Sequence, residues 1–596
     1  MARSDPHSYA DPAQPVARHV HFAWDVDFAA RRISGTATLT FEVPGGGPLD
    51  LDTKGLIVAS VRDAVGKPVS WELEEEEPIL GRRLHLEVPP GTALVSIDYS
   101  TSPDAVGLQW LTPAQTEGKA HPFLFSQCQP IHARTLAPLQ DSPRFRVTYG
   151  ADVTVPEPLS AVMSAASMGA RQGPRPGTRT FAFRMPQAIP SYLIALAVGE
   201  IASRELSPRS RVWAEPSTVE AAAREFGGVE AMIATAEGIF GPYEWERYDM
   251  LVLPPSFPYG GMENPRMTFL TPTLIAGDRS LVDVVAHELA HSWTGNLVTN
   301  ASMDHFWLNE GFTVWAERRI LEALHGPERV ALDWALGQTG LDLALDQFGR
   351  DSPVTRLRTD LQGIDPDDAF SRIPYEKGAR FLALIERSVG RPRFDAFVRE
   401  YMDRFRFTSI SSEEFLAFVD ERLPGTSAQV NATAWLYEPG IPANAPVFES
   451  KALEALAALA EGWASGRRPS REQAAAWTPT ETLVYLQRLP RELPAADCAW
   501  LDATLGLSGR GNYEILVEWL TIAAGSDYEP AFPKLREVLT RVGRMKYLRP
   551  LYTAMGRHRR TRALAREIFA AASESYHVLS RRVAQSVMEK YAAPSP

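Results

Sequence analysis

The feature that most constrains this chain is a His-Glu-x-x-His string, His287 to His291, followed after eighteen residues by Glu310. Two histidines four positions apart on a helix project from the same face, so both imidazoles can reach one metal ion. A tetrahedral zinc site with three protein ligands leaves its fourth position for water. We therefore predict that His287, His291 and Glu310 bind one Zn²⁺ ion and that Glu288 is the general base.

A structural interpretation of the same residues has to be weighed against the metal site. Two histidines alone could be ordinary buried side chains with hydrogen bonds. Glu288 and Glu310, at these positions, favour the metal site. Glu317 could accept a hydrogen bond from a ligand imidazole, or it could be a solvated charge beside Arg318 and Arg319. The sequence leaves both possibilities for Glu317 open.

The segments around the motif have helical patterns. Ser280 can cap a helix that carries the histidines, and Asp283 three positions later completes a box-like pair. Gly295 and Asn296 offer a stop for this helix. Residues 307–324 form a second predicted helix, with Glu310 near its beginning. Packing the two helices side by side would close a three-ligand site.

The pattern of apolar residues changes along the chain and indicates several domains, as expected for 596 residues. Apolar residues alternate with polar ones from Val20 to Val43 and again in residues 84–99, which predicts half-buried antiparallel strands. The pattern becomes helical from about Ser217. A stretch rich in proline and glycine at residues 438–450 reads as a linker, and amphipathic helical spacing follows it.

Charge and cysteine content limit the partners and the compartment. The chain has 61 basic and 73 acidic residues, and its net charge of −12 disfavours nucleic acid as the main partner. No apolar run approaches the roughly eighteen residues that a membrane span needs. Only Cys128 and Cys498 are present, which excludes a disulfide framework. Because the N-terminal segment also lacks an apolar secretory core, we expect a cytoplasmic protein.

A glycine pair precedes the metal motif, in the sequence Gly260-Gly261-Met262-Glu263. Two glycines let a backbone approach a ligand closely. A carboxylate beside them would hold the free ammonium of a peptide and so fix which bond meets the metal. The alternative is that the glycines only form a turn, as most such pairs do.

Six segments of the chain resemble the M1 family of zinc aminopeptidases, and most closely its leukotriene A4 hydrolase branch, whose enzymes are both aminopeptidases and epoxide hydrolases. These segments are residues 125–129, 258–264, 287–296, 307–311, 374–378 and 543–546. The resemblance implies an α+β multidomain protein with a thermolysin-like zinc domain. We expect an N-terminal antiparallel β domain at 1–206, the catalytic domain at 207–442, a linker at 443–450 and an all-α, helical-repeat-like C-terminal domain at 451–596.

The resemblance also implies roles for single residues of the site. Glu263 would hold the α-ammonium of the substrate, beside Gly260, Gly261 and Met262. Tyr375 would donate its hydroxyl to the oxyanion of the tetrahedral intermediate, a role that needs a donor aimed where charge develops.

Further residues would contact the rest of the peptide. Gln127 and Gln129 would line the pocket for the first side chain. Arg544 and Lys546 would receive the C-terminal carboxylate of a short peptide. From composition alone, Arg544 and Lys546 would be surface charges.

One position departs from the branch. Asp367 matches an aspartate that serves epoxide hydrolysis and helps to receive basic side chains, but Phe370 stands where the branch has a tyrosine. Phe370 lacks the hydroxyl that a tyrosine would bring into the pocket. Peptide cleavage does not depend on that hydroxyl.

Three functional hypotheses follow. The first is a monomeric zinc aminopeptidase that acts on short peptides. The second is an additional epoxide hydrolase activity on lipid epoxides in the same pocket, with Asp367 directing water. The third is a non-catalytic peptide-binding scaffold, which would have no need of Glu288.

Overall fold

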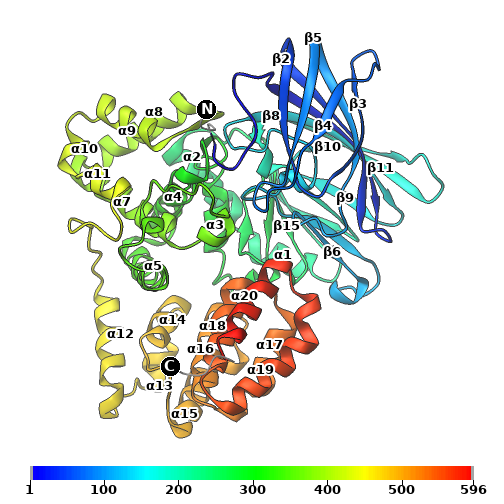
Figure 1. The fold of residues 1–596 in the computed structure, drawn as a ribbon. Coiled ribbons are helices and arrows are strands. Elements are labelled where there is room, and N and C mark those ends of the chain that lie inside the picture. Colours follow the sequence, from blue (N-terminus) through cyan, green and yellow to red (C-terminus); the bar gives the residue numbers. More distant parts are fainter. Residues whose placement is uncertain (1–4, 592–596) are drawn as a thin grey trace.

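The computed structural model describes residues 5–591. Its three largest hydrophobic cores lie among the N-terminal strands, in the central α/β part and among the C-terminal helices. The N-terminal strands occupy one side of the molecule, and the central and C-terminal helices lie beside and below them (Figure 1). Among the described residues, no helix has the length and apolarity that crossing a bilayer requires.

The N-terminal part consists mainly of antiparallel strands, as the alternating apolar residues predict, and these strands form two sheets. Val20, Phe22 and Trp24 are all buried, on one face of the first strand. The eight-stranded sheet has the order β10-β11-β8-β1-β2-β5-β3, with β4 also on β5. Its strands are β1 (Ala17–Asp27), β2 (Arg32–Thr53), β3 (Ile57–Asp63), β4 (Ser70–Leu73), β5 (Arg82–Ser100), β8 (Arg146–Pro156), β10 (Ala166–Gln172) and β11 (Thr178–Pro190). The four-stranded sheet consists of β6 (Leu108–Leu111), β7 (Phe123–Ser126), β12 (Leu196–Gly199) and β9 (Ser160–Met163).

A five-stranded sheet follows and supplies one wall of the site. Its order is β13 (Ala202–Ser207), β14 (Ser210–Ala214), β15 (Tyr248–Val252), β17 (Met267–Leu270) and β16 (Gly261–Met262). The strands β14, β15 and β17 are parallel, whereas β16 pairs antiparallel with β17 and forms the edge. The glycine pair of the sequence therefore leads into an edge strand.

The helices that belong to this part carry several of the functional side chains, and the first three of them contact the sheet. They are α1 (Val219–Phe226), α2 (Val229–Phe240), α3 (Asp283–Ala290), α4 (Trp307–His325), α5 (Pro327–Phe348), α6 (Pro366–Ala369), α7 (Ile373–Val389), α8 (Arg391–Phe405), α9 (Ser412–Arg422), α10 (Thr426–Gln429) and α11 (Ala432–Tyr437). A short parallel pair, β18 (Val298–Asn300) and β19 (Thr408–Ile410), lies beside them.

The start of α3 differs from the sequence prediction. The helix begins at Asp283 and Val282 precedes it without a side-chain cap, so Ser280 does not cap it. Instead, the Ser280 hydroxyl accepts a hydrogen bond from Asn512 Nδ2 at 2.7 Å. The Ser280 hydroxyl, which the local sequence assigned to the helix cap, is thus used in a tertiary contact with the C-terminal part.

Two features hold α4 against α7. Gly311 and Gly378 face each other so closely that a Cβ on Gly311 would lie 2.7 Å from the Gly378 Cα. Glu376 accepts hydrogen bonds from Arg318 and Arg380, each at 2.8 Å. Burial alone would raise the pKa of Glu376, but the two guanidinium charges lower it to about 2. Because a buried ion pair is costly to break, these contacts fix the position of Tyr375 relative to α4.

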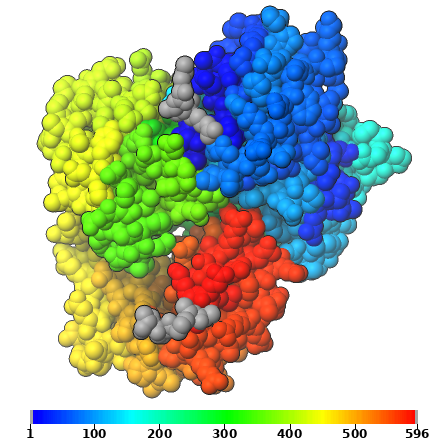
Figure 2. All heavy atoms as spheres, in the orientation of Figure 1, coloured from blue at the N-terminus to red at the C-terminus, as the bar shows by residue number. Residues whose placement is uncertain are grey.

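In the C-terminal part, residues 451–591 form helices and no strands. No helix or strand lies between Tyr437 and Lys451, where the linker is predicted. The helices are α12 (Lys451–Glu461), α13 (Arg471–Ala475), α14 (Pro479–Gln487), α15 (Ala495–Leu505), α16 (Tyr513–Gly525), α17 (Phe532–Arg541), α18 (Met545–Met555), α19 (Arg559–Ala572) and α20 (Val578–Glu589). They pack against both other parts (Figure 2), and an ion pair at 3.0 Å joins Arg541 to Glu117 of the N-terminal part.

Candidate active site

The three predicted metal ligands converge between α3 and α4. The Nε2 atoms of His287 and His291 lie 3.2 Å apart, and Glu310 Oε2 lies 3.4 Å and 3.5 Å from them. Glu310 Oε2 is buried and has no hydrogen-bond partner. Metal bonds of about 2.0–2.1 Å in tetrahedral geometry separate ligand atoms by about 3.3 Å, so these distances fit a zinc ion.

Outer hydrogen bonds orient both imidazoles toward this point. His287 Nδ1 lies 2.9 Å from Glu317 Oε2, and His291 Nδ1 lies 3.0 Å from both the Thr294 carbonyl and the Thr313 hydroxyl. A proton on each Nδ1 leaves the Nε2 lone pair free for a metal. Of the two possibilities for Glu317, its contact with His287 matches the orienting acceptor.

Glu288 is buried next to the ligands and against the edge strand β16. A Cβ added to Gly261 would lie 2.3 Å from Glu288 Oε1, so only glycine allows this close approach. Burial raises the pKa of Glu288 well above its usual value, and the positive charge of His287 opposes the shift. The carboxylate thus lies beside the metal position without being one of the three converging ligands.

Glu263 follows β16 and lies on the other side of the same space. Gln129 Nε2 donates to Glu263 Oε1 at 3.3 Å, and Asn296 Nδ2 donates to the Glu263 carbonyl at 2.7 Å. Ligand atoms of Glu263, Glu288 and His291 lie within 4.8 Å of one another. Burial, and then the charge of Glu310, raise the pKa of Glu263 to about 8.

Tyr375 lies at the beginning of α7, on the side of His287. Its ring is nearly parallel to the His287 ring, with the centroids 6.2 Å apart. Burial, followed by the negative charge of Glu310, raises the pKa of Tyr375 well above its usual value. The phenol therefore keeps its proton and is available as a hydrogen-bond donor.

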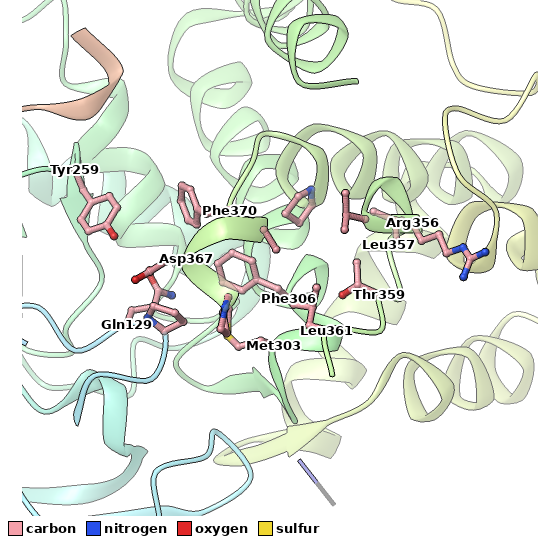
Figure 3. A pocket seen from close by; sticks show the side chains of 15 residues that line it. Gln129, Tyr259, Met303, Phe306, Arg356, Leu357, Thr359, Leu361, Asp367 and Phe370 are labelled. Carbon is pink, nitrogen blue, oxygen red and sulfur yellow. The ribbon is translucent and has the colours of Figure 1, made fainter. Parts of the chain in front are cut away.

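A cavity of about 590 Å³, part of it open to solvent, lies between Gln129, Phe306 and Phe370 (Figure 3). Its wall is mostly apolar and includes Phe306 and Phe370, whose rings lie 6.2 Å and 5.9 Å from that of Tyr375. Gln129 and Asp367 bring polar groups into the same wall. Two aromatic residues of the wall thus neighbour Tyr375, whereas His287, His291 and Glu310 do not line the cavity.

Gln127 lies elsewhere. It is buried outside this wall, and its Nε2 donates to Met262 Sδ at 3.2 Å. Of the two glutamines predicted to line the pocket, the structure brings Gln129 into the cavity and Gln127 against the edge strand.

Arg544 reaches the site from the C-terminal part. The Gly543 and Met545 amides donate to the Pro255 and Pro258 carbonyls at 2.8 Å and 2.9 Å, which anchors the segment next to the glycine pair. A Cβ on Gly260 would lie 2.6 Å from Arg544 Nη2. Arg544 is buried, so the interpretation of Arg544 as a surface charge is wrong, whereas Lys546 is 59% exposed.

Sequence reasoning missed two residues of this region. His132 Nε2 lies 3.0 Å from Asp367 Oδ2, and Glu514 contacts both Arg544 and Lys546. His132 stands three residues after the segment 125–129, so the resemblance offered a weak signal for it. Glu514 lies at the start of a mostly buried helix, and the sequence carried no signal for it.

The fold and this set of side chains define a metallopeptidase of the His-Glu-x-x-His type. Comparison with known proteins gives the family: residues 226–435 match the peptidase family M1 domain and residues 16–193 match the peptidase M1 N-terminal domain. Residues 477–588 match the leukotriene A4 hydrolase C-terminal domain. The chain belongs to peptidase family M1, in its leukotriene A4 hydrolase branch, and is a hydrolase of this zinc-dependent family.

Individual relatives are similar to this chain over nearly its whole length. A leukotriene A-4 hydrolase homolog from Botryotinia fuckeliana is 38% identical over 97% of this chain and 92% of its own length. Leucine aminopeptidase 2 from Yarrowia lipolytica is 39% identical over 93% and 89%. The structure of yeast leukotriene A4 hydrolase in complex with bestatin superimposes with a TM-score of 0.90, at 31% identity, over 99% of this chain and 98% of that one.

The hydrogen bond from His287 to Glu317 generates a prediction about metal affinity. Because loss of such an outer partner typically weakens metal binding about 10–100-fold, Glu317→Ala should raise the zinc dissociation constant by that factor. The measurement is competition against a chelating dye. Glu322→Ala is the matched control, since Glu322 lies on the same helix but pairs with Arg391 at 2.9 Å. Equal zinc affinity in the two variants would contradict the role of Glu317.

Proposed function

We propose that the protein removes N-terminal residues from short peptides, with one zinc ion per chain held by His287, His291 and Glu310. The observation that carries this proposal is the position of Glu263, whose carboxylate lies within 4.8 Å of Glu288 and His291. A buried carboxylate there suits an α-ammonium group, so the bond that is cleaved would lie at a fixed position from the free N-terminus. An endopeptidase would have no use for it.

The donor set and the charge balance support the metal. Two imidazole nitrogens and one carboxylate oxygen are common zinc ligands, and the buried Glu310 Oε2 has no hydrogen-bond partner. A bound zinc ion lowers the pKa of water toward neutrality and polarises a carbonyl oxygen.

Glu288 would act as the acid and base of peptide cleavage. Its carboxylate takes a proton from the attacking water as the new C–O bond forms. It returns this proton to the leaving amine as the C–N bond breaks. The hydroxyl of Tyr375 donates to the oxygen on which negative charge develops in the transition state. Burial of both groups strengthens these interactions, because the surroundings are poorly screened.

The chain itself would hold both ends of a short peptide. Glu263 binds the ammonium, and Gln129 donates to Glu263 and so fixes the carboxylate. The edge strand β16 exposes backbone groups to which an extended peptide can add. Arg544 directs a guanidinium edge toward Gly260, and its Nε has no hydrogen-bond partner. With Lys546 it supplies a receptor for the peptide's C-terminal carboxylate.

The apolar cavity and the two thiols support finer parts of the proposal. The wall around Phe306 and Phe370 suits a large apolar or aromatic first side chain, and Asp367 suits a basic one. Cys128 and Cys498 are both free and buried, which supports a reducing compartment such as the cytoplasm.

A test of the base is the Glu288→Gln variant. Amide and carboxyl side chains have nearly the same shape, so zinc content should stay near one ion per chain while the rate of aminoacyl-anilide hydrolysis falls about 10²–10⁴-fold. Glu322→Gln, a change of the same kind remote from the ligands, should keep full activity. If zinc-loaded Glu288→Gln hydrolyses the anilide at the wild-type rate, Glu288 is not the base. A zinc-free wild-type protein that stays inert after zinc addition would instead support a non-catalytic scaffold.

Epoxide hydrolysis is a second candidate function, favoured by the position of Asp367. Its carboxylate lies in the wall of the largely apolar cavity, and one oxygen is held by His132 at 3.0 Å. Asp367 would take a proton from water as a C–O bond forms at a distant carbon of a conjugated lipid. The epoxide C–O bond breaks, and the epoxide oxygen takes up a proton to give a diol.

Incubation with an allylic fatty-acid epoxide tests this second function. We expect one diol isomer in excess over the spontaneous products, and loss of that excess in Asp367→Asn with peptidase activity retained. Spontaneous diols alone, in the wild-type protein, would contradict it.

A further inference from the structure

The cationic pair Arg544 and Lys546 is already in contact with a carboxylate of the chain itself. Glu514 Oε2 lies 2.7 Å from Lys546 Nζ, and Glu514 Oε1 lies 3.4 Å from Arg544 Nη1. The Tyr547 hydroxyl donates to the same Oε1 at 3.0 Å. An internal carboxylate thus occupies part of the receptor proposed for the carboxylate of the peptide.

The geometry divides the receptor into a held part and a movable part. The Arg544 side chain is only 6% exposed, and its Nη1 also donates to the Tyr547 hydroxyl at 2.6 Å. Its opposite edge, with the unpartnered Nε, faces Gly260. Lys546 is 59% exposed and its chain is flexible. The buried Nε of Arg544 thus leaves a hydrogen-bond donor beside Gly260 for a peptide carboxylate, which also has to draw Lys546 away from Glu514.

The charges of Arg544, Lys546 and Glu514 also indicate that the receptor is partly occupied. Two cations and one anion leave one net positive charge for the peptide. Burial would raise the pKa of Glu514, but the charges of Lys546 and Arg544 lower it to about 2. Glu514 therefore stays ionised throughout the pH range in which a folded enzyme works.

We propose that Glu514 is a specificity-determining residue that weakens the binding of the peptide's C-terminal carboxylate, by competing for Lys546 and cancelling one positive charge. The proposal rests on the proposed function, in which Arg544 and Lys546 receive that carboxylate. The consequence is binding of intermediate strength. Short peptides are preferred because their carboxylate reaches Arg544 and Lys546. Cleaved products are still released because Glu514 partly neutralises these two cations.

The test compares a tripeptide with a free C-terminal carboxylate against the same tripeptide amide. In each variant the quantity is the ratio of the two KM values, acid over amide, so that general losses of activity cancel. One unscreened charge at this distance corresponds to about a five- to tenfold change in binding. Glu514→Gln, which keeps the side-chain shape, should lower the ratio by about that factor. The change should shrink at high salt.

Matched variants separate charge from structure. Glu518→Gln removes the same charge from the same helix but from a pair with Arg491, and should leave the ratio at the wild-type value. Lys546→Gln should raise the ratio toward one. The double variant Glu514→Gln/Lys546→Gln again has one net positive charge, and its ratio should return close to wild type. Thermal unfolding of each variant checks that it is folded.

The possible failures are distinguishable. If the wild-type protein binds the acid and the amide equally, the proposed role of Arg544 and Lys546 is wrong. If the wild-type protein prefers the acid but Glu514→Gln leaves the ratio unchanged or raises it, the inference about Glu514 is wrong and the proposed function stands. A double variant with a higher ratio than Lys546→Gln would mean that Glu514 acts only as a structural support.

Discussion

The active site depends on the crowding of three buried carboxylates, those of Glu263, Glu288 and Glu310, around two histidines. Negative charges this close and this deep are costly unless cations join them. Burial lowers the pKa of His291 to about 4, so its imidazole is neutral and His287 alone of the two histidines supplies positive charge. A dication between the ligand atoms and an ammonium beside Glu263 would relieve the repulsion. The crowding of these carboxylates thus supports the proposed metal and the proposed ammonium group beside Glu263.

The scaffold keeps these groups close against their repulsion. Glycines at two contacts remove side chains that would push the elements apart: Gly261 lets β16 approach Glu288, and Gly311 lets α4 approach α7. The buried contact of Glu376 with Arg318 ties the helix of Tyr375 to the helix of Glu310. In the C-terminal part, a backbone hydrogen bond at Gly543 helps to hold Arg544 beside Gly260. In the proposed function, different parts of the chain would therefore bind the two ends of the peptide.

Features that depend on local geometry could be predicted from the sequence. The closeness of His287 and His291 follows from helical spacing, and the N-terminal strands follow from the alternation of apolar residues around Trp24. The cap at Ser280 was wrong because Asn512, more than two hundred residues away, uses the hydroxyl. The domain boundaries at 206, 442 and 450 stay predictions. Contacts between distant segments, such as His132 with Asp367, leave no periodic signal, so only the three-dimensional structure reveals them.

The central claim is that the site binds the free N-terminus of a peptide and cleaves the bond after its first residue. The most direct measurement is mass spectrometry of a short peptide, free or N-acetylated, after incubation with the zinc-loaded protein. The account predicts release of the first residue from the free peptide and no cleavage of the acetylated one, because acetylation removes the ammonium that Glu263 binds. Cleavage of the acetylated peptide at a comparable rate, or cuts at internal bonds, would contradict it.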